Sequence, residues 1–264
     1  MRKSRRQAFG QHFLASPSVL RRIVAVIDPR PGDVIIEIGA GRGVLTRALA
    51  AGADLVVAIE KDRRLIPSLA EAVPDNVRVV HADILRIDFP EILSGLGVTE
   101  ARLAGNLPYS ISSPLLVKVL ESKDLFSDCI FLLQKEVGER IAAGPGSKQF
   151  APLSVFFQNE FEVRLEFKVS PGSFSPPPKV TSALLSLRRR PSPLIEEVGS
   201  TEFRSFLRTA FAERRKKLLN NLARYAPRDR LRAAFAELGL SENARAEDLP
   251  AATFAALFRL LKLR

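Results

Sequence analysis

Apolar residues in the first half of the chain form short continuous runs, separated by stretches with helical spacing. The expected strands lie at residues 33–38, 55–59, 77–81, 101–104 and 130–134, where apolar residues predominate and each strand holds at most two polar ones. Between runs, apolar residues recur three and four positions apart, as they do in the stretch that opens at Ser16 and Pro17 and continues to Ile27. Continuous apolar runs are typical of strands buried on both faces, and strands alternating with helices form parallel sheets. The pattern therefore predicts an α/β fold.

Later in the chain the pattern changes twice. Residues 161–169 alternate in polarity and residues 183–187 form another apolar run, so both predict strands. After the basic residues 188–190 and Pro191 the spacing is helical throughout. The expected helices span residues 202–211, 214–224, 228–238 and 251–263. We therefore expect a sheet domain of residues 1–190 and a small all-helical domain of residues 191–264.

The composition argues against several classes of protein and of site. The 264 residues are 46% hydrophobic and 26% charged, as in ordinary globular proteins. No apolar run approaches the roughly 18 residues that span a bilayer, and residues 1–11 are polar and basic without an apolar signal core. One cysteine and two histidines exclude an intrachain disulfide and argue against a zinc site. We expect a cytoplasmic protein with no membrane segment and no metal.

The net charge of +11 is concentrated at the two ends of the chain. Residues 1–30 carry a net +6, residues 31–187 a net −3, and residues 188–264 a net +8. This distribution favours a polyanionic partner, although basic faces that only contact water are an alternative. The candidate contacts are Arg5 and Arg6 in a basic arm, and Arg214, Arg215, Lys216 and Lys217 at an expected helix start. Positive charge there opposes the helix dipole, so phosphate binding explains this cluster better than helix stability does.

Three polar features follow successive strands of the expected sheet. Gly39, Gly41 and Gly43 form a turn between a strand and a helix, where a ligand can approach the backbone closely. Their spacing is not the dinucleotide fingerprint, which argues against NAD. Glu60 ends the second strand, where the ribose of a bound nucleoside would lie. Asp83 follows the third strand and can accept a hydrogen bond from an exocyclic amine, or it is a solvated turn residue.

The fourth expected strand leads into Asn106, Leu107, Pro108 and Tyr109. The Asn106 amide oxygen and a free backbone carbonyl at Leu107 are hydrogen-bond acceptors, and Pro108 restricts the conformation of Leu107. Tyr109 offers a ring for stacking, so the segment suits a planar base with an exocyclic amino group. The alternative is an ordinary turn between a strand and a helix. Because the carboxyl ends of parallel strands share one edge of a sheet, we expect the four features to form one site.

Phe174 lies in a proline-rich loop, residues 173–180, between two expected strands. A stiff loop of this kind could present the Phe174 ring at the site. Packing of the ring to anchor the loop is an equally good interpretation.

Together these segments resemble the small-subunit ribosomal RNA adenine dimethyltransferase family, whose relatives include the erythromycin-resistance rRNA methyltransferases. The matching segments are residues 10–14, 37–46, 58–60, 82–83, 105–109, 134–137, 174–182 and 211–216. The resemblance implies a Rossmann-like class I methyltransferase domain followed by an RNA-binding helical domain. His12 stands where many members of the family carry Asn, and Ser110 replaces a common Asn.

The resemblance also implies the ligands and the residues that bind them. The cofactor would be S-adenosylmethionine and the substrate two adjacent adenosines in a hairpin loop near the 3′ end of small-subunit rRNA. The implied cofactor-binding residues are Gln11, His12, Leu14, Gly39, Gly41, Glu60, Lys61, Asp83, Ile84 and Asn106. Residues 106–109 would be catalytic, and Tyr109 and Phe174 would stack on the target base.

For the mechanism, we expect acceptors at Asn106 and the Leu107 carbonyl to direct the lone pair of adenine N6 toward the methyl group, with no general base required. We expect a monomer bound to a precursor of the small ribosomal subunit. Two alternatives stay open: a non-catalytic ribosome-assembly factor on the same fold, and a methyltransferase acting on large-subunit rRNA or on DNA.

Overall fold

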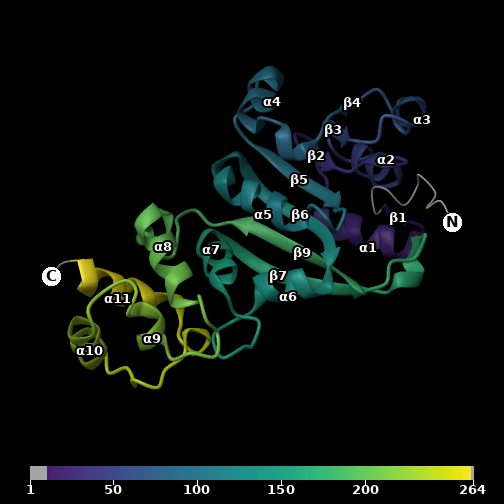
Figure 1. Cartoon of the computed structure of the whole chain (residues 1–264). Helices are drawn as coiled ribbons and strands as arrows, with labels where there is room; N and C mark the ends of the chain where they lie inside the picture. The colour runs from purple at the N-terminus through teal and green to yellow at the C-terminus, as the bar shows by residue number, and fades with distance from the viewer. Residues whose placement is uncertain (1–10, 263–264) are drawn as a thin grey trace. The chain divides into compact units, whose positions relative to one another are not determined.

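A computed structural model describes residues 11–262 of the chain. Its main feature is a seven-stranded sheet with the strand order β4-β3-β2-β5-β6-β9-β7 (Figure 1). In that order the strands span Val77–His81, Leu55–Glu60, Val34–Ile38, Ala101–Asn106, Phe126–Gln134, Ser182–Arg189 and Phe161–Val169. The first five pair in parallel, and β9 pairs with β6 in the antiparallel direction. The predicted α/β fold is confirmed.

Helices connect the parallel strands, as the alternating pattern predicts. They are α2 (Val44–Ala50), α3 (Ile66–Ala72), α4 (Phe89–Leu96) and α5 (Ser112–Glu121), with short turns at η2 (Ile84–Arg86) and η3 (Lys123–Leu125). Helix α1 (Pro17–Ile27) precedes the first parallel strand, α6 (Lys135–Ala142) follows the last one, and the turn η4 (Pro171–Ser173) precedes β8. Helix α1 begins where the Ser16 hydroxyl accepts the N–H of Val19, and it ends at Asp28, which has a positive φ of 49°. Helix α4 is an element that the sequence analysis did not anticipate.

One core lies between the sheet and the helices α1 and α2. It contains Ile23 and Ile27 of α1, Leu49 of α2, and strand residues such as Ile35 and Val56. These side chains are at most 3% exposed. Ile23 and Ile27 are one helical turn apart, so the apolar spacing read from the sequence is the buried face of α1.

A second, two-stranded sheet brings distant parts of the chain together. Its strands are β1 (Phe13–Leu14) and β8 (Phe174–Ser175), and they pair in the antiparallel direction. The backbone N–H groups of Ala15 and Ser16 both donate to the carbonyl oxygen of Ser173. The segment before α1 is therefore fixed to the proline-rich loop.

The chain divides into two compact units, and the division differs from the expected boundary at residue 190. Residues 139–161 and 190–264 form the second unit, whereas residues 1–138 and 162–189 form the first. The helices of the second unit are α7 (Pro152–Glu160), α8 (Thr201–Ala210), α9 (Leu218–Leu222), α10 (Arg228–Glu237) and α11 (Ala251–Lys262), with turns at η5 (Glu196–Gly199) and η6 (Ala246–Asp248). The ring of Phe150 contacts that of Phe211, with centroids 5.9 Å apart, and the N–H of Arg190 donates to Glu160. These contacts explain why residues 139–161 group with the C-terminal helices.

The second unit has an aromatic core. Phe203 and Phe206 of α8 pack against Phe258 of α11, with ring centroids 5.3 and 5.5 Å apart. The helix expected over residues 214–224 is wrong in extent, because α9 covers only Leu218–Leu222. The N–H of Leu218 donates to the carbonyl oxygen of Ala244, which fixes the chain entering α9. No helix in the described part of the chain is long and apolar enough to cross a membrane.

Candidate functional site

A cavity of about 340 Å³ opens at the carboxyl ends of the parallel strands in the first unit. The predicted residues that line it are Gln11, His12, Gly39, Gly41, Glu60, Lys61, Asp83, Ile84, Asn106, Leu107, Pro108 and Tyr109. They come from five separate parts of the sequence, and the parallel topology brings the four strand ends together. The volume suits a ligand of the size of a small cofactor.

The glycine turn forms one wall of the cavity. Gly39 and Gly41 have φ values of +75° and +59°, a conformation that favours glycine. A Cβ atom on Gly41 would lie 3.1 Å from the ring of Phe13. A side chain at Gly41 would therefore press against Phe13, and the turn presents backbone rather than side chains to the cavity.

Glu60 lies at the end of β3 and is 5% exposed. Its Oε2 accepts the N–H of Gly41 at 2.8 Å and its Oε1 accepts the N–H of Asp62 at 2.7 Å. Both oxygens are thereby fixed in place, and each keeps a second lone pair for a donor on a ligand. A pair of neighbouring hydroxyl groups fits such a carboxylate.

Asp83 faces the cavity from the turn after β4. Lys61 Nζ lies 2.7 Å from Asp83 Oδ2, and the N–H of Leu85 donates to Oδ1 at 3.1 Å. The hydrogen bond from Lys61 lowers the pKa of the Asp83 carboxyl, and partial burial opposes this. Asp83 is consequently an ionised acceptor, and the neighbouring Ile84 is a buried apolar surface at 4% exposure.

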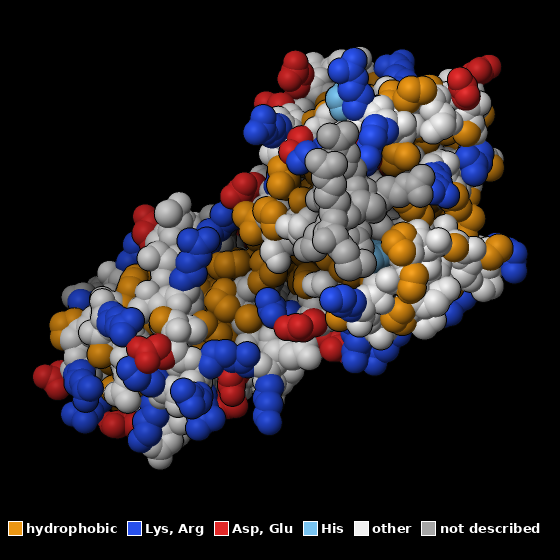
Figure 2. All heavy atoms as spheres, turned by 45° about the vertical axis from the view of Figure 1, so that its right-hand side comes forward, with side chains coloured by type: hydrophobic (Ala, Val, Ile, Leu, Met, Phe, Trp, Pro, Cys, Tyr) orange, Lys and Arg blue, Asp and Glu red, His pale blue; other side chains and the backbone are white. Residues whose placement is uncertain are grey.

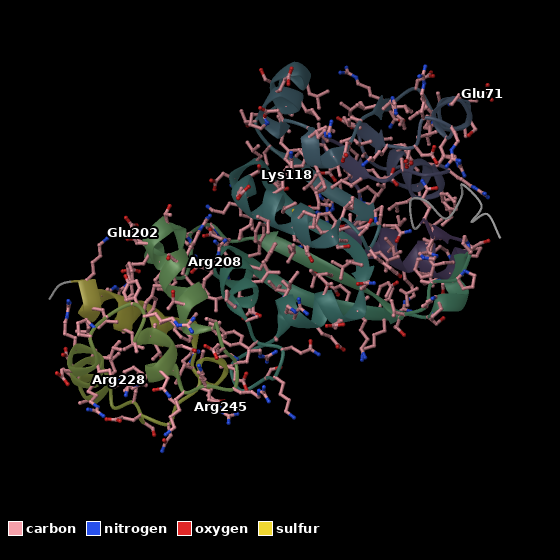
Figure 3. All side chains as sticks on the ribbon, in the orientation of Figure 1. Glu71, Lys118, Glu202, Arg208, Arg228 and Arg245 are labelled. Carbon is pink, nitrogen blue, oxygen red and sulfur yellow. The ribbon has the colours of Figure 1, made fainter. Side chains whose placement is uncertain are left out.

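Lys118 of α5 supports this turn from behind. Its ammonium group donates to the carbonyl oxygens of Leu85 and Ile87 and lies 5.2 Å from the centroid of the Phe89 ring. Figure 3 labels this side chain within the first unit. The turn that carries Asp83 and Ile84 is thus anchored to a helix as well as to the sheet.

Asn106 ends β5, and its amide has a defined orientation. Its Nδ2 donates to the backbone carbonyl oxygen of His12 at 2.8 Å. A carbonyl can only accept a hydrogen bond, so this contact determines which end of the amide is nitrogen. Asn106 Oδ1 then remains available as an acceptor at the cavity.

Leu107 provides a second acceptor from the backbone. Its N–H donates to the carbonyl oxygen of Leu132 at 2.9 Å, which extends the β5–β6 pairing beyond the strand. Among the described residues, no group donates to the carbonyl oxygen of Leu107. Asn106 Oδ1 and the Leu107 carbonyl oxygen are therefore two acceptors on adjacent residues of the site. The side chain of Leu107 is buried, at 1% exposure.

The ring of Tyr109 is held by two contacts. Its hydroxyl lies 2.7 Å from Ser182 Oγ, and its ring centroid lies 5.6 Å from that of His12. Burial raises the pKa of Tyr109, and the hydrogen bond with Ser182 opposes this. His12 Nδ1 lies 2.8 Å from the carbonyl oxygen of Pro176, so Nδ1 carries the proton.

Two predicted residues do not line the cavity. Phe174 is 4% exposed and belongs to the core between the sheet and α1, and Leu14 packs against the same core. Their strands β1 and β8 pair Leu14 with Phe174. The stacking role predicted for Phe174 is not supported by this position, which fits the alternative interpretation of a packed, loop-anchoring ring.

The basic cluster at residues 214–217 lies in the second unit, in the turn before α9 rather than on the helix. Arg214 forms an ion pair with Glu247, and Lys216 forms one with Glu213. Arg215 and Lys217 are exposed, and neither has an ion-pair partner in the described part of the chain. Lys217 is the N-cap of α9, so of the four cations it is the one at the start of the helix. Arg214 and Lys216 are paired, which leaves two of the four cations without an ion-pair partner in the described residues. Arg5 and Arg6 lie outside the described residues.

The surface of the second unit carries further basic side chains. Figure 2 shows many Lys and Arg side chains and fewer acidic ones on the helical part. Figure 3 labels Arg208 of α8, Arg228 of α10 and Arg245 before η6. All three are exposed, so the net positive charge of this region is available to a partner.

The sequence analysis missed several residues of the cavity: Phe13, Ile38, Ile59, Asp62, Ala82, Ser110 and Ile111. Asp62 is the polar member that is nearly buried, at 4% exposure. Hydrogen bonds from Arg64 lower its pKa, and a hydrogen bond from Gln11 adds to this. Its position two residues after Glu60, at the same strand end, was the signal that could have identified it. No group of three His, Cys, Asp or Glu among residues 11–262 is arranged to hold a metal ion.

Comparison with known families gives a match over almost the whole chain. The model of the family described as ribosomal RNA adenine dimethylase matches residues 2–263. The ribosomal RNA small subunit methyltransferase A of Geobacter metallireducens is 44% identical over 261 residues, 97% of this chain and 95% of its own. The protein of the same name from Xylella fastidiosa is 43% identical over 254 residues, 96% of this chain and 94% of its own.

Solved structures share the fold. The 23S rRNA methyltransferase ErmE is 30% identical with a TM-score of 0.76, and the match covers 95% of this chain and 99% of that protein. A dimethyladenosine transferase from Plasmodium falciparum matches with a TM-score of 0.80 over 96% of this chain and 98% of its own, at 24% identity. The sheet described above is thus that of α/β methyltransferases.

Proposed function

Because the chain belongs to the ribosomal RNA adenine dimethylase family, we propose that it transfers methyl groups from S-adenosylmethionine to N6 of adenosines in small-subunit rRNA. The substrate of this proposal is a pair of adjacent adenosines in the hairpin loop near the 3′ end, each dimethylated. Relatives that are 43–44% identical over nearly their whole length are named for the small subunit. The 23S enzyme is 30% identical, so similarity favours the small subunit over the large one.

The cavity fits the proposed cofactor in the chemistry of its donors and acceptors. Glu60 would accept the two ribose hydroxyls, and Asp83, paired with Lys61, would accept the exocyclic amine of the adenine. Ile84 would cover the adenine ring. Gly39 and Gly41 leave backbone room for the methionine end, and Gln11 and His12 line the cavity beside them. When bound, S-adenosylmethionine supplies an electrophilic methyl group on a positively charged sulfur.

The observation that carries the catalytic proposal is the orientation of the Asn106 amide. With Nδ2 bound to the His12 carbonyl oxygen, Asn106 Oδ1 can accept one N–H of the target N6. The free carbonyl oxygen of Leu107 can accept the other. Held in this way, the N6 lone pair points out of the base plane toward the methyl group, and the two acceptors stabilise the positive charge that develops on N6.

The protein must contact both the target base and the phosphate backbone of the RNA, and different residues are proposed for each. The target adenosine must leave its stack to reach the site, and the ring of Tyr109 offers a face for it. Phosphate contacts are assigned to the basic surface of the second unit, above all to Arg215 and Lys217. The binding partner of this proposal is a precursor of the small subunit, bound by a monomer.

The test is methyl transfer from labelled S-adenosylmethionine to small subunits that lack the modification, followed by nucleoside analysis. We expect dimethyladenosine in the small-subunit rRNA. Subunit binding without any transfer would contradict the proposal and support the alternative of a non-catalytic assembly factor. Transfer to large subunits alone would also contradict it.

Asn106→Ala tests the catalytic assignment within that assay. Loss of one oriented acceptor is expected to lower kcat, measured at saturating cofactor, by roughly 100-fold or more. Asn243→Ala, at an exposed position of the second unit, is the matched control and is expected to keep the wild-type rate. A wild-type rate for Asn106→Ala with normal cofactor binding would remove Asn106 from the mechanism.

A further inference from the structure

The loop between β7 and β9 contacts the site at two points, and neither involves the side chain of Phe174. The carbonyl oxygen of Pro176 accepts the Nδ1–H of His12, and Ser182, at the first position of β9, bonds the hydroxyl of Tyr109. The rings of His12 and Tyr109 contact each other at 35°. The loop thus holds a pair of touching rings from both ends.

Ser182 is fully buried, and its position is set by the sheet. It is 0% exposed, and the β6–β9 register places it opposite Gln134. A side chain with one torsion angle on a central strand can hold its hydroxyl oxygen in one place. Tyr109 follows Pro108 in a turn and is only partly buried, so its ring has no comparable support from its own backbone.

We propose that Ser182 is a positioning residue that fixes the ring of Tyr109 for stacking on the target adenine. The inference rests on the proposed function and deepens it: the segment that runs from the proline-rich loop into β9 acts at the site through Pro176 and Ser182 rather than through the ring of Phe174. A ring held at its hydroxyl and along one side by His12 leaves its remaining face for the base. Stacking on a fixed ring loses less conformational entropy than stacking on a mobile one.

A purely structural role for the hydrogen bond makes a different prediction. If Ser182 and Tyr109 only satisfied each other's polar groups, removing the bond would lower stability and leave the kinetics of the folded enzyme unchanged. A positioning role instead lowers kcat/KM for the RNA without affecting the cofactor. The two roles are therefore separated by kinetics measured on folded protein.

The experiment is a double-mutant cycle of Ser182→Ala and Tyr109→Phe, with kcat and KM for small subunits and the Kd for S-adenosylmethionine. Loss of one hydrogen bond of this kind changes a rate or binding constant by about 5- to 10-fold. We expect each single variant to lower kcat/KM by about that factor, the double variant to lose no more than either, and the cofactor Kd to stay within 2-fold. Ser186→Ala is the control, because Ser186 lies on the same strand and its hydroxyl bonds Glu166.

Wild-type kinetics for Ser182→Ala, or losses that multiply in the double variant, would overturn the inference. If Ser182→Ala does not fold, Tyr109→Phe removes the same hydrogen bond from the other side without altering β9, and its kcat/KM alone decides. Failure of the proposed function is distinguishable, because wild-type protein would then produce no dimethyladenosine.

Discussion

Glu37 places a carboxyl group inside the sheet, two residues before the glycine turn. It is 2% exposed, and its Oε2 has no hydrogen-bond partner among the described residues. Burial raises the pKa of Glu37 to about 7, the nearby Thr46 hydroxyl opposes this, and the negative charge of Glu60 adds to it. Folding therefore favours the protonated form of this group.

The stability of the protein should consequently depend on pH through Glu37. Between about pH 4.5 and 7 the folded protein holds this proton while the unfolded chain releases it, so the free energy of unfolding falls as the pH rises. Glu37→Gln is expected to remove this dependence and to stabilise the protein by up to about 3 kcal/mol above pH 7, with little effect below pH 4.5.

Urea unfolding of the cofactor-free protein at several pH values measures this. Glu71→Gln is the control, because Glu71 is exposed and Figure 3 labels it on the outer part of the first unit. An equal pH dependence in wild type and Glu37→Gln would show that Glu37 is ionised in the folded protein.

At the scale of elements, Arg102 of β5 links its own strand to β2, β6 and helix α1, at the end of the sheet opposite the cavity. Its guanidinium donates to both carboxylate oxygens of Asp128 at 2.8 Å, to Asp33 at 2.6 Å, and to the carbonyl oxygens of Ile27 and Asp28. Burial lowers the pKa of Arg102, but Asp128 and Asp33 outweigh this and raise it above its ordinary value. The starts of β2, β5 and β6 and the end of α1 thus share one cation.

Arg102→Met is expected to lower the free energy of unfolding by about 3–5 kcal/mol, since it leaves two partly buried carboxylates without their partner. Denaturant unfolding measures the change. Arg30→Met removes an arginine whose side chain is 73% exposed from its pair with Asp28, and should cost less than about 1 kcal/mol. Equal effects of the two substitutions would show that the Arg102 network adds no more than a surface pair does.

Elements with a local signal were predictable from the sequence. The strand ending at Glu60 is a continuous apolar run, and the strand ending at Asn106 is mainly apolar apart from Arg102. The parallel strands of the sheet place both residues at one edge. The contact between Asn106 and His12 was not predictable, because it joins residues 94 positions apart through a backbone carbonyl. The burial of Phe174 likewise depends on pairing with Leu14, and two-residue strands leave no periodic pattern.

Similar reasoning explains the error at α9. Residues 214–224 include good helix formers, but the ion pair of Arg214 with Glu247 and the hydrogen bond from the N–H of Leu218 to the carbonyl oxygen of Ala244 hold the first of them in a turn. Tertiary contacts outweighed local propensity there.

At the scale of the whole molecule, the charge distribution predicts how RNA binding responds to salt. Arg215 and Lys217 are exposed cations without ion-pair partners in the described residues, whereas Arg214 and Lys216 are paired. The double variant Arg215→Ala and Lys217→Ala should weaken RNA binding and lower the slope of log K against log salt by about 2.

The matched control is the double variant Arg214→Ala and Lys216→Ala, which should change the slope less because acidic partners already neutralise those cations. Binding is measured from 50 to 200 mM salt, with the cofactor Kd as a check on folding. A larger change in the control than in the test variant would contradict the assignment of phosphate contacts.

The strand order has a consequence for synthesis of the chain from its N-terminus. Strand β9 lies between β6 and β7, although it follows both in the sequence. Until residues 182–189 have left the ribosome, β6 has a free edge and Tyr109 lacks the hydroxyl of Ser182. A nascent chain truncated before β9 would therefore carry the whole cofactor cavity but an unfinished sheet, exposed to pairing with other chains. The same late strand thus closes the edge of β6 and supplies the hydroxyl that bonds Tyr109.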